Sequence, residues 1–374
     1  MKFVVSTGAL HKKLSAISGV ISNNPIVPIL ENFLLKIENG QLTAIASDLQ
    51  TTMMTSLPVE VDEEGSVAVP AKILMDTLKS LPEQPVTISV DLESFVTEIH
   101  SANGHYKLAG ENALDFPSIP TPQSGTEIFI SADVLSEAIS NTIFAVSNDE
   151  LRPAMNGIFI ELKGDHINFV ATDGNRLIRY RRNDISTPIE SAFIVPKKAL
   201  NLLKGALPND NTEVAITFTP HNAFFSFNNT RTVCRLIEER FPEYENAIPQ
   251  NNDKILIVNR QEMLNSLKRL DIYANKATHL VRFKLGGSRL EILAEDIDFS
   301  NEASETIACQ YEGEAMEIGF NARYLIEMLS AIATDEVKIT LSEANRAGII
   351  MPAEQSEEED ILMLLMPIML NNYV

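Results

Sequence analysis

Three aspartates and six histidines are the residues whose types suit catalysis or metal binding. Asp48, Asp173 and Asp296 recur at offsets of 125 and 123 residues, each at the end of an alternating apolar stretch. Clustered carboxylates hold the catalytic metal ions of nucleases. A catalytic group is needed only once, however, whereas each of these aspartates occupies the same place in a repeated pattern. We therefore expect them to be turn residues that accept hydrogen bonds from their own backbone.

The six histidines show none of the usual spacings of metal ligands. They are His11, His100, His105, His166, His221 and His279. The chain also lacks the glycine-rich loops that hold nucleotide phosphates and the Gly-x-Ser-x-Gly motif of a nucleophilic serine. The pattern indicates a protein that is not an enzyme, without catalytic residues, a metal site or a cofactor. A nucleic-acid enzyme that uses the repeated acids is the rival interpretation.

The three aspartates close three similar stretches of sequence. They are LLKIENGQLTAIASD (34–48), FIELKGDHINFVATD (159–173) and RFKLGGSRLEILAED (282–296). Alternation of apolar and polar residues on both sides of a glycine-containing turn is typical of a β-hairpin. Each stretch is therefore predicted to form one hairpin of a repeated unit.

Other markers recur at a similar distance. VPAKILMDTLKSLP (69–82) returns 126 residues later as VPKKALNLLKGALP (195–208), and two Phe-Pro pairs lie 125 residues apart. Several independent markers with one period indicate an internal repeat. We expect three domains, which span residues 1–122, 123–251 and 252–374.

A short β-type run leads into a helical pattern six times, at intervals of about 60–64 residues. The predicted helices span residues 8–24, 71–81, 132–150, 196–207, 259–277 and 320–333. Each domain therefore contains two halves in which strands alternate with one helix. This pattern indicates an α+β fold.

The net charge of −21 argues against a protein that simply coats nucleic acid, where lysine and arginine must neutralise phosphates. The six predicted helices nevertheless carry a net positive charge together, so the rest of the chain is more acidic still. One interpretation is that helix surfaces tolerate lysine and loops tolerate acids. The other is that the helices line one surface that faces a polyanion.

The stretch ILMLLMPIML (361–370) places ten apolar residues near the end of the chain. A membrane anchor, a core strand and a partner-binding surface are the three alternatives. A spanning helix needs about 20 apolar residues. The stretch is therefore predicted to be part core strand and part partner site. With two cysteines and no apolar run of signal-peptide length at the start, we expect a cytoplasmic protein without membrane contact.

The second hairpin is followed by an arginine-rich run. ATDGNRLIRYRR (171–182) holds four arginines, whereas the matching ASDLQTTMMTSL (46–57) has no charge besides Asp48. Arginines grip carboxylates and carbonyl oxygens. The run is either an exposed, solvated hairpin or a recognition surface that is unique to the second domain.

The whole chain resembles the family of bacterial sliding clamps, the beta subunits of DNA polymerase III. The resemblance rests on MKF at the start, NPIVPILENFLL (24–35), ATDGNRL (171–177), RFPEY (240–244), MEIGFN (316–321) and MP (366–367). It implies three domains of one topology, each with two helices packed on antiparallel sheets. It further implies a head-to-tail homodimer that forms a ring around double-stranded DNA, independent of DNA sequence, in the cytoplasm at the nucleoid.

The resemblance also implies one partner pocket per chain, between the second and third domains. Short Gln-, Leu- and Phe-containing peptides of the replicative polymerase catalytic subunit, the clamp loader and repair polymerases would bind there. The implied pocket residues are Arg152, Met155, Thr172, Gly174, Asn175, Arg176, Leu177, Pro242, Asn246, Ala247, Asn321, Tyr324, Leu364, Leu365, Met366, Pro367, Ile368 and Met369. Of these, Asn175, Asn246, Ile368 and Met369 depart from common clamp patterns.

Two further sets of residues follow from the resemblance. The implied DNA contacts are Lys12, Lys13, Lys72, Lys79, Lys197, Lys198 and Lys204. The implied dimer seam joins Tyr106 and Leu108 to Ile272 and Tyr273 of the second copy. The acid-rich segment 132–150 is a departure, because a helix with Asp149 and Glu150 would repel DNA. The alternative function is a protein-binding repeat scaffold that does not encircle DNA.

Overall fold

The computed structural model describes residues 1–374 except 23, 123–124, 188 and 371–374. Helices and antiparallel sheets occur together, so the expected α+β fold is confirmed. The chain divides into two compact units, which are Met1–Ser136 with Lys198–Leu236 and Glu137–Lys197 with Ile237–Val374. Each unit is described by itself below.

In the described residues, each α-helix begins directly after a strand, as the repeated pattern predicts. The pairs are β1 (Lys2–Ser6) with α1 (Thr7–Ser18), β6 (Gly65–Pro70) with α2 (Ala71–Ser80), β10 (Thr126–Ser131) with α3 (Ala132–Thr142), β14 (Glu190–Pro196) with α4 (Lys197–Ala206), β18 (Lys254–Asn259) with α5 (Arg260–Leu270), and β22 (Met316–Asn321) with α6 (Ala322–Ala331). The last strand residue caps several of these helices. Ser6 Oγ accepts a hydrogen bond of 3.1 Å from the backbone N–H of Ala9, which satisfies a donor of the first turn.

Three predicted helices end earlier than expected, at Ser18, Thr142 and Leu270. The largest difference follows α3, where the chain forms the short 3₁₀ helix η3 (Ile143–Ala145) and then a loop. In that loop, the Asp149 carboxylate accepts a hydrogen bond from the backbone N–H of Leu151 at 3.0 Å. Asp149 and Glu150 therefore belong to a turn, and the prediction of a helix over residues 132–150 is wrong in its second half.

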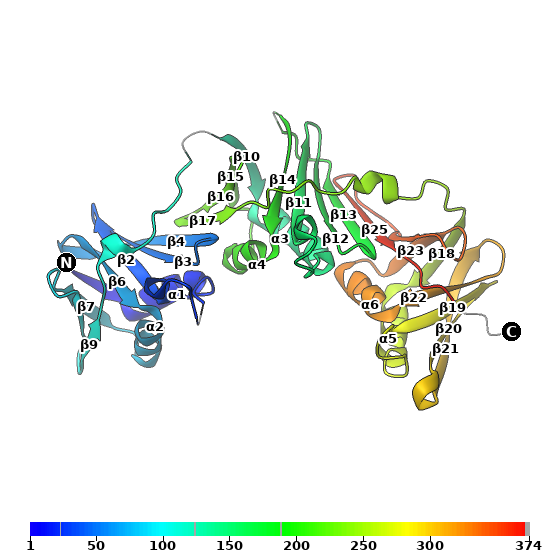
Figure 1. The fold of residues 1–374 in the computed structure, drawn as a ribbon, viewed down its shortest axis with the longest axis horizontal. Coiled ribbons are helices and arrows are strands. Elements are labelled where there is room, and N and C mark those ends of the chain that lie inside the picture. Colours follow the sequence, from blue (N-terminus) through cyan, green and yellow to red (C-terminus); the bar gives the residue numbers. More distant parts are fainter. Residues whose placement is uncertain (23, 123–124, 188, 371–374) are drawn as a thin grey trace. The chain divides into compact units, whose positions relative to one another are not determined.

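The first unit contains a five-stranded sheet, ordered β5-β1-β7-β8-β9, and an eight-stranded sheet, ordered β10-β15-β16-β17-β4-β3-β2-β6. Its other strands are β2 (Asn32–Glu38), β3 (Gln41–Ser47), β4 (Thr51–Pro58), β5 (Glu60–Glu63), β7 (Pro85–Val90), β8 (Val96–His100), β9 (His105–Ala109), β15 (Glu213–Phe218), β16 (Asn222–Phe227) and β17 (Thr230–Arg235). Helices α1 and α2 lie side by side (Figure 1). Their apolar faces pack with Phe3 and Phe33 of the two sheets in one buried core.

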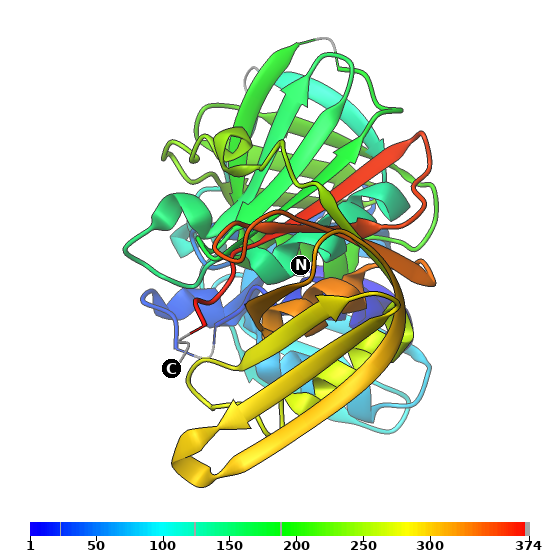
Figure 2. The same ribbon diagram turned by 90° about the vertical axis from the view of Figure 1, so that its right-hand side faces the viewer.

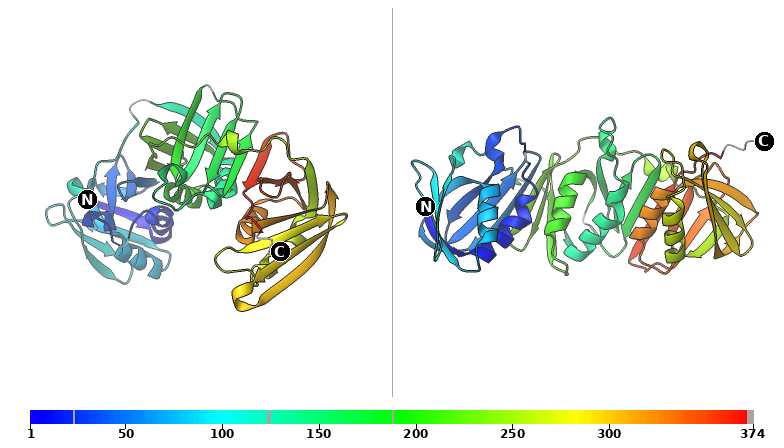
Figure 3. Two further views of the ribbon diagram at one scale, coloured as in Figure 1. Left: turned by 45° about the vertical axis from the view of Figure 1, so that its right-hand side comes forward. Right: turned by 90° about the horizontal axis from the view of Figure 1, so that it is seen from below.

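The second unit contains a twelve-stranded sheet, ordered β14-β11-β12-β13-β25-β24-β23-β18-β21-β20-β19-β22. Its other strands are β11 (Gly157–Lys163), β12 (Ile167–Thr172), β13 (Arg176–Arg182), β19 (Leu280–Gly286), β20 (Arg289–Asp296), β21 (Asn301–Glu312), β23 (Glu336–Leu341), β24 (Gly348–Pro352) and β25 (Glu359–Leu365). Figure 2 shows the long strands β20 and β21 in yellow, and helices α5 and α6 lie side by side (Figure 3).

Both units join parts of the chain that the repeat assigns to different domains. Strand β4 pairs with β17 in the first unit, and β13 pairs with β25 in the second. Because these sheets run across the predicted boundaries, the compact units do not coincide with three equal domains. The division at residues 122 and 251 remains a prediction.

The three predicted hairpins are confirmed as β2–β3, β11–β12 and β19–β20. The aspartates that follow the hairpins accept hydrogen bonds from the backbone of their own turns, as expected. Asp48 Oδ1 accepts hydrogen bonds from the backbone N–H groups of Gln50 and Thr51 at 3.0 and 2.6 Å, and Asp296 Oδ1 accepts one from Asp298 at 3.2 Å. Among the described residues, no helix is both long and apolar enough to span a bilayer.

Candidate functional site

A cavity of about 490 Å³ opens beside the turn between β12 and β13 in the second unit. Four of the predicted pocket residues line it, namely Arg152, Asn175, Arg176 and Tyr324. The remaining lining residues are Phe144, Val146, Ser147, Asn148, Asp173, Lys197 and Glu327. Side chains from four separate stretches of the chain therefore line one cavity together with Arg176.

The turn that presents this arginine is held by its own side chains. Thr172 Oγ1 donates a hydrogen bond of 2.6 Å to the carbonyl oxygen of Arg176 and accepts one of 3.1 Å from the N–H of Gly174. Asp173 Oδ1 accepts from the backbone N–H groups of Asn175 and Arg176 at 2.9 and 3.1 Å. Gly174 has a φ of +91°, which favours glycine because residues with a Cβ rarely adopt this backbone conformation.

The guanidinium of Arg176 is buried and is bound from several sides. Its Nε donates to Asp173 Oδ2 at 3.0 Å, its Nη2 donates to the carbonyl oxygen of Phe144 at 2.7 Å, and its Nη1 pairs with Glu327. The Tyr324 ring centroid lies 4.3 Å from Cζ, which is a cation–π contact. A buried charge with this many partners is fixed in position, so Arg176 forms a rigid wall of the cavity.

The partners of Arg176 on α6 are placed by a helix cap. Asn321 Oδ1 accepts hydrogen bonds from the backbone N–H groups of Arg323 and Tyr324 at 2.9 and 3.2 Å. This cap starts the helix so that Tyr324 and Glu327, three residues apart, lie on one face. Asn321 was predicted to border the pocket, and the structure gives it a positioning role.

An apolar cluster lies behind the turn. Leu177 and Leu364, both predicted pocket residues, are buried there with Phe241 and Tyr244. The Phe241 ring stacks on Phe159 with centroids 4.6 Å apart. This cluster packs the start of β13, the tail strand and the RFPEY segment together.

Tyr244 is also anchored through polar contacts, which fix the segment that follows it. Its hydroxyl donates to Glu161 Oε2 at 2.8 Å, and Asn168 Nδ2 donates to the same carboxylate at 2.9 Å. Burial opposes ionisation of Glu161, but hydrogen bonds from Asn168, Lys163 and Tyr244 outweigh it and hold the pKa of Glu161 below its usual range. With Phe241 and Tyr244 buried, the predicted residues Pro242, Asn246 and Ala247 are exposed.

The tail strand confirms the core-strand part of the prediction for the final apolar stretch, and the partner-site part stays a prediction. Strand β25 pairs with β13 from Arg182↔Glu359 to Arg176↔Leu365, and Leu365 is fully buried. Beyond it, Met366 is exposed, and the N–H of Ile368 donates to the carbonyl oxygen of Gly319 at 2.8 Å. The four residues 371–374 lie outside the described part of the chain.

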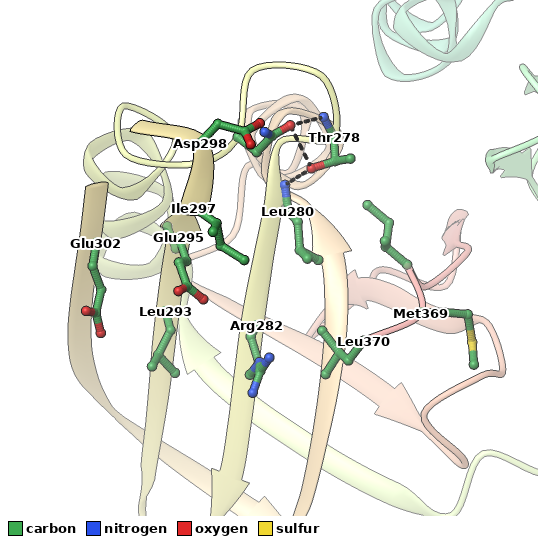
Figure 4. Close-up of a pocket in the computed structure, with 13 residues that line it drawn as sticks. Thr278, Leu280, Arg282, Leu293, Glu295, Ile297, Asp298, Glu302, Met369 and Leu370 are labelled. Atoms are coloured by element: carbon green, nitrogen blue, oxygen red, sulfur yellow. Dashed lines mark hydrogen bonds between the residues drawn. The ribbon is translucent and has the colours of Figure 1, made fainter. Parts of the chain in front are cut away.

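The end of the tail enters a different cavity from the one around Arg176. Ile368, Met369 and Leu370 line a pocket of about 530 Å³ together with residues of β19, β20 and η6 (Ile297–Phe299). Figure 4 shows Leu370 next to Arg282 of β19. Six of the eighteen predicted pocket residues therefore line these two cavities, four in the first and two in the second, and the other twelve, among them Pro367 and the half-buried Met155, line neither.

The arginine-rich run binds acids of its own chain. Arg179 pairs with Asp360, and Arg182 Nη2 pairs with Asp184 at 2.7 Å, while Arg181 Nε donates to Asn168 at 2.9 Å. Three of the four arginines of this strand, Arg176 included, thus form ion pairs with carboxylates of the second unit. Arg179 and Arg182 are thus engaged within the second unit, and the interpretation of this run as a recognition surface stays a prediction.

The predicted DNA contacts lie on three helices. Lys12 and Lys13 are on α1, Lys72 and Lys79 on α2, and Lys197, Lys198 and Lys204 on α4. All are exposed except Lys13 and Lys197, which are half-buried. Lys198 pairs with Asp48, and Lys197 Nζ donates to Asn148 Oδ1 at 3.1 Å. Lys197 thus contributes to the cavity wall rather than to a free helix surface.

The predicted seam residues differ in exposure within one chain. Ile272 and Tyr273 follow α5 and are exposed, as is Tyr106 on β9. Leu108 is buried in the core of the first unit. Three of the four side chains are therefore available to a second copy.

Sequence reasoning missed the loop side of the cavity. Phe144 and Asn148 were not assigned to it, because residues 132–150 were interpreted as one helix, and Lys197 was predicted to contact DNA instead. Asn148 followed by Asp149, with Pro153 close behind, is a loop signal that could have identified this side.

Comparisons with known proteins cover almost the entire chain. Models of the DNA polymerase III beta subunit match its N-terminal domain at residues 1–120, its central domain at 129–243 and its C-terminal domain at 245–368. The beta sliding clamp of Vibrio cholerae is 30% identical over 371 residues, which cover 99% of this chain and 100% of that protein. The chain belongs to the beta sliding clamp family.

Solved structures of the family have the same fold as this chain. A sliding clamp of Pseudomonas aeruginosa bound to griselimycin is 29% identical with a TM-score of 0.94, and the match covers 99% of this chain and 100% of that one. The sliding clamp of Bacillus subtilis is 25% identical with the same TM-score, at 99% coverage of both chains. The family resemblance and the clamp-type fold expected from the sequence are thereby confirmed.

Proposed function

We propose that this chain is a DNA sliding clamp without catalytic activity of its own. Two copies join head to tail into a ring around double-stranded DNA, which they encircle without reading its sequence. The ring tethers the replicative polymerase catalytic subunit, the clamp loader and repair polymerases, in the cytoplasm at the nucleoid. The observation that carries this proposal is the similarity to beta sliding clamps over nearly the full length of both chains.

The internal repeat supports a ring. Three domains, at residues 1–122, 123–251 and 252–374, give six similar units in a dimer, and a head-to-tail interface closes when its rotations sum to a full turn. The seam would join Tyr106, supported by the buried Leu108, to Ile272 and Tyr273 of the second copy. Exposed lysines on α1, α2 and α4 would face the phosphates.

The geometry around Arg176 supports peptide binding. A polar cavity with a fixed arginine adjoins an apolar cluster at Leu177 and Leu364, with Pro242 and Met366 exposed nearby in the second unit. Burying a Leu and a Phe of a peptide gives about 3–6 kcal/mol, and a few hydrogen bonds then bring the affinity to about the micromolar range. Weak binding suits a site whose occupants must exchange.

Retention on DNA tests the proposal. The purified chain is loaded onto nicked circular DNA, and the bound fraction is measured by gel filtration before and after the circle is cut. A clamp stays on the circle and leaves once free ends appear. Equal retention on circular and linear DNA would refute encirclement. No retention, with peptide binding intact in a single-chain particle, would favour the protein-binding scaffold.

A further inference from the structure

The edge hairpin of the five-stranded sheet brings two histidines and a glutamate together. Strands β8 and β9 pair antiparallel, with His100 opposite His105 and Glu98 opposite Lys107. Residues directly opposite each other share a face, and so do residues two apart on one strand. The hairpin therefore projects Glu98, His100, His105 and Lys107 from one face, while Ile99 on the other face is fully buried in the core.

The donor atoms of three of these side chains converge. His100 Nε2 lies 3.5 Å from Glu98 Oε2, and His105 Nε2 lies 3.4 Å from the same oxygen. One ligand atom from each residue lies within 4.8 Å of the others. The two imidazole rings are stacked, with centroids 4.4 Å apart and an interplanar angle of 14°.

These separations match the ligand sphere of a transition metal. In a tetrahedral site with bonds of about 2.0–2.2 Å, neighbouring donor atoms lie about 3.3–3.6 Å apart. Both Nε2-to-Oε2 distances already meet this condition. The two histidines are exposed, so a small rotation of each ring closes the remaining gap between the nitrogens.

We propose that Glu98, His100 and His105 form a binding site for a transition-metal dication, best matched by Zn²⁺, on the outer face of the first unit. Two imidazoles and one carboxylate are ligands that zinc accepts, and water completes the coordination. The site is separate from the cavity around Arg176, and it does not depend on the proposed clamp function. The sequence did not reveal it because the five-residue gap from His100 to His105 spans a turn.

The backbone of the hairpin fixes the positions from which the two histidines project. The N–H of Ser101 donates to the carbonyl oxygen of Gly104 at 2.9 Å, which closes the turn directly beside both histidines. Since β9 is the edge strand, only β8 holds it within the described sheet. A metal with ligands on both strands would link β9 to β8 and raise the thermal stability of the chain by mass action.

Calorimetric titration with ZnCl₂ tests the proposal on the full chain, freed of metal by a chelator that is then removed. We expect one Zn²⁺ per chain in this site, with affinity reduced about tenfold or more in His100→Ala, His105→Ala and Glu98→Gln. His11→Ala, a histidine of α1, is the matched control and should keep the wild-type affinity. Wild-type affinity in the three cluster variants would overturn the proposal.

A second measurement guards against misfolded variants. Without metal, each variant should unfold at the wild-type urea midpoint, since the histidines are exposed. In nuclear magnetic resonance spectra of the wild type, Zn²⁺ should shift the imidazole signals of His100 and His105 before those of the other histidines. Shifts that begin at another histidine would refute the assigned site even if zinc binds.

Discussion

The backbone N–H of Met366 donates a hydrogen bond of 2.9 Å to the carbonyl oxygen of Asn175. It extends the pairing of β25 with β13 one residue beyond the Arg176↔Leu365 pair. The tail and the turn that carries Arg176 are thus held together by the backbone, whatever their side chains are. Both sides of the candidate peptide site therefore belong to one sheet.

Truncation of the tail should separate binding from folding. A chain that ends at Leu365 keeps β25 but loses Met366, Ile368 and Met369. We expect peptide affinity to fall about tenfold or more, because the lost apolar contacts contribute about 1.5–3 kcal/mol each. Fluorescence anisotropy with a labelled Gln-, Leu- and Phe-containing peptide measures this.

Two further truncations bracket that result. Removing Leu365 as well takes away a fully buried side chain and should lower the free energy of unfolding by about 2–5 kcal/mol. Removing only residues 371–374 should change peptide affinity less than about tenfold, which is 1.4 kcal/mol. A larger loss from the shortest truncation would show that these four residues belong to the site.

Replacing Arg176 with alanine should both loosen the cavity and destabilise the second unit. The change leaves Asp173 and the Phe144 carbonyl without their charged partner, and hydrogen bonds to charged groups contribute about 1.5–3 kcal/mol each. We expect a loss of about 2–4 kcal/mol in urea denaturation, with weaker peptide binding.

Arg152→Ala is the matched control for that variant. Arg152 lines the same cavity but is exposed, and it pairs with Asp149 at 2.9 Å on the surface. Its removal should change stability by less than about 1 kcal/mol. Equal losses in the two variants would contradict the structural role assigned to Arg176.

An arginine at position 272 should prevent dimer formation. Ile272 is 65% exposed in the single chain, and burying a charged group in an apolar seam without a partner is costly. Light scattering coupled to gel filtration should then give the mass of one chain. Leu114→Arg, at an exposed apolar position outside the predicted seam, should remain dimeric. A dimeric Ile272→Arg chain would place the seam elsewhere.

Glu161→Gln should make stability less dependent on pH. The pKa of Glu161 is lowered in the folded chain, so its ionised form stabilises the fold above the usual value of 4.5, and this contribution is lost as the pH falls through the lower folded value. We expect the variant to be about 1 kcal/mol less stable at pH 7. The difference should vanish in urea titrations at pH values well below 4.5; a constant difference would mean that packing, not charge, explains the loss.

The parts of the fold that could be predicted are those that depend on local sequence patterns. The β-hairpins, the six strand-to-helix junctions and the turn aspartates depend on residues near one another in the chain, so periodicity and turn chemistry were sufficient. The end of α3 was mispredicted because the apolar spacing continues past Thr142, where the chain instead forms η3 and a loop with side-chain hydrogen bonds of Ser147 and Asp149.

Features that depend on the pairing of strands far apart in the sequence were not predicted. Nothing in residues 171–182 indicates that Arg179 meets Asp360, because that pairing follows from β25 lying next to β13. Likewise, the position of Met369 at a second cavity follows from the hydrogen bond between the N–H of Ile368 and the carbonyl oxygen of Gly319, two residues far apart in the chain. The family resemblance could propose residues of the candidate site, but it could not predict their contacts.

The pairing of β25 with β13 also determines how the tail withstands mechanical load. Its hydrogen bonds are perpendicular to the strands, as in any antiparallel pair, and they join seven residue pairs. A pull directed along β25 is therefore a shearing force that all of these bonds resist together, whereas a pull across the sheet would open them one at a time. A motor protein tethered to the end of this tail would be held most firmly when it pulls along the strand.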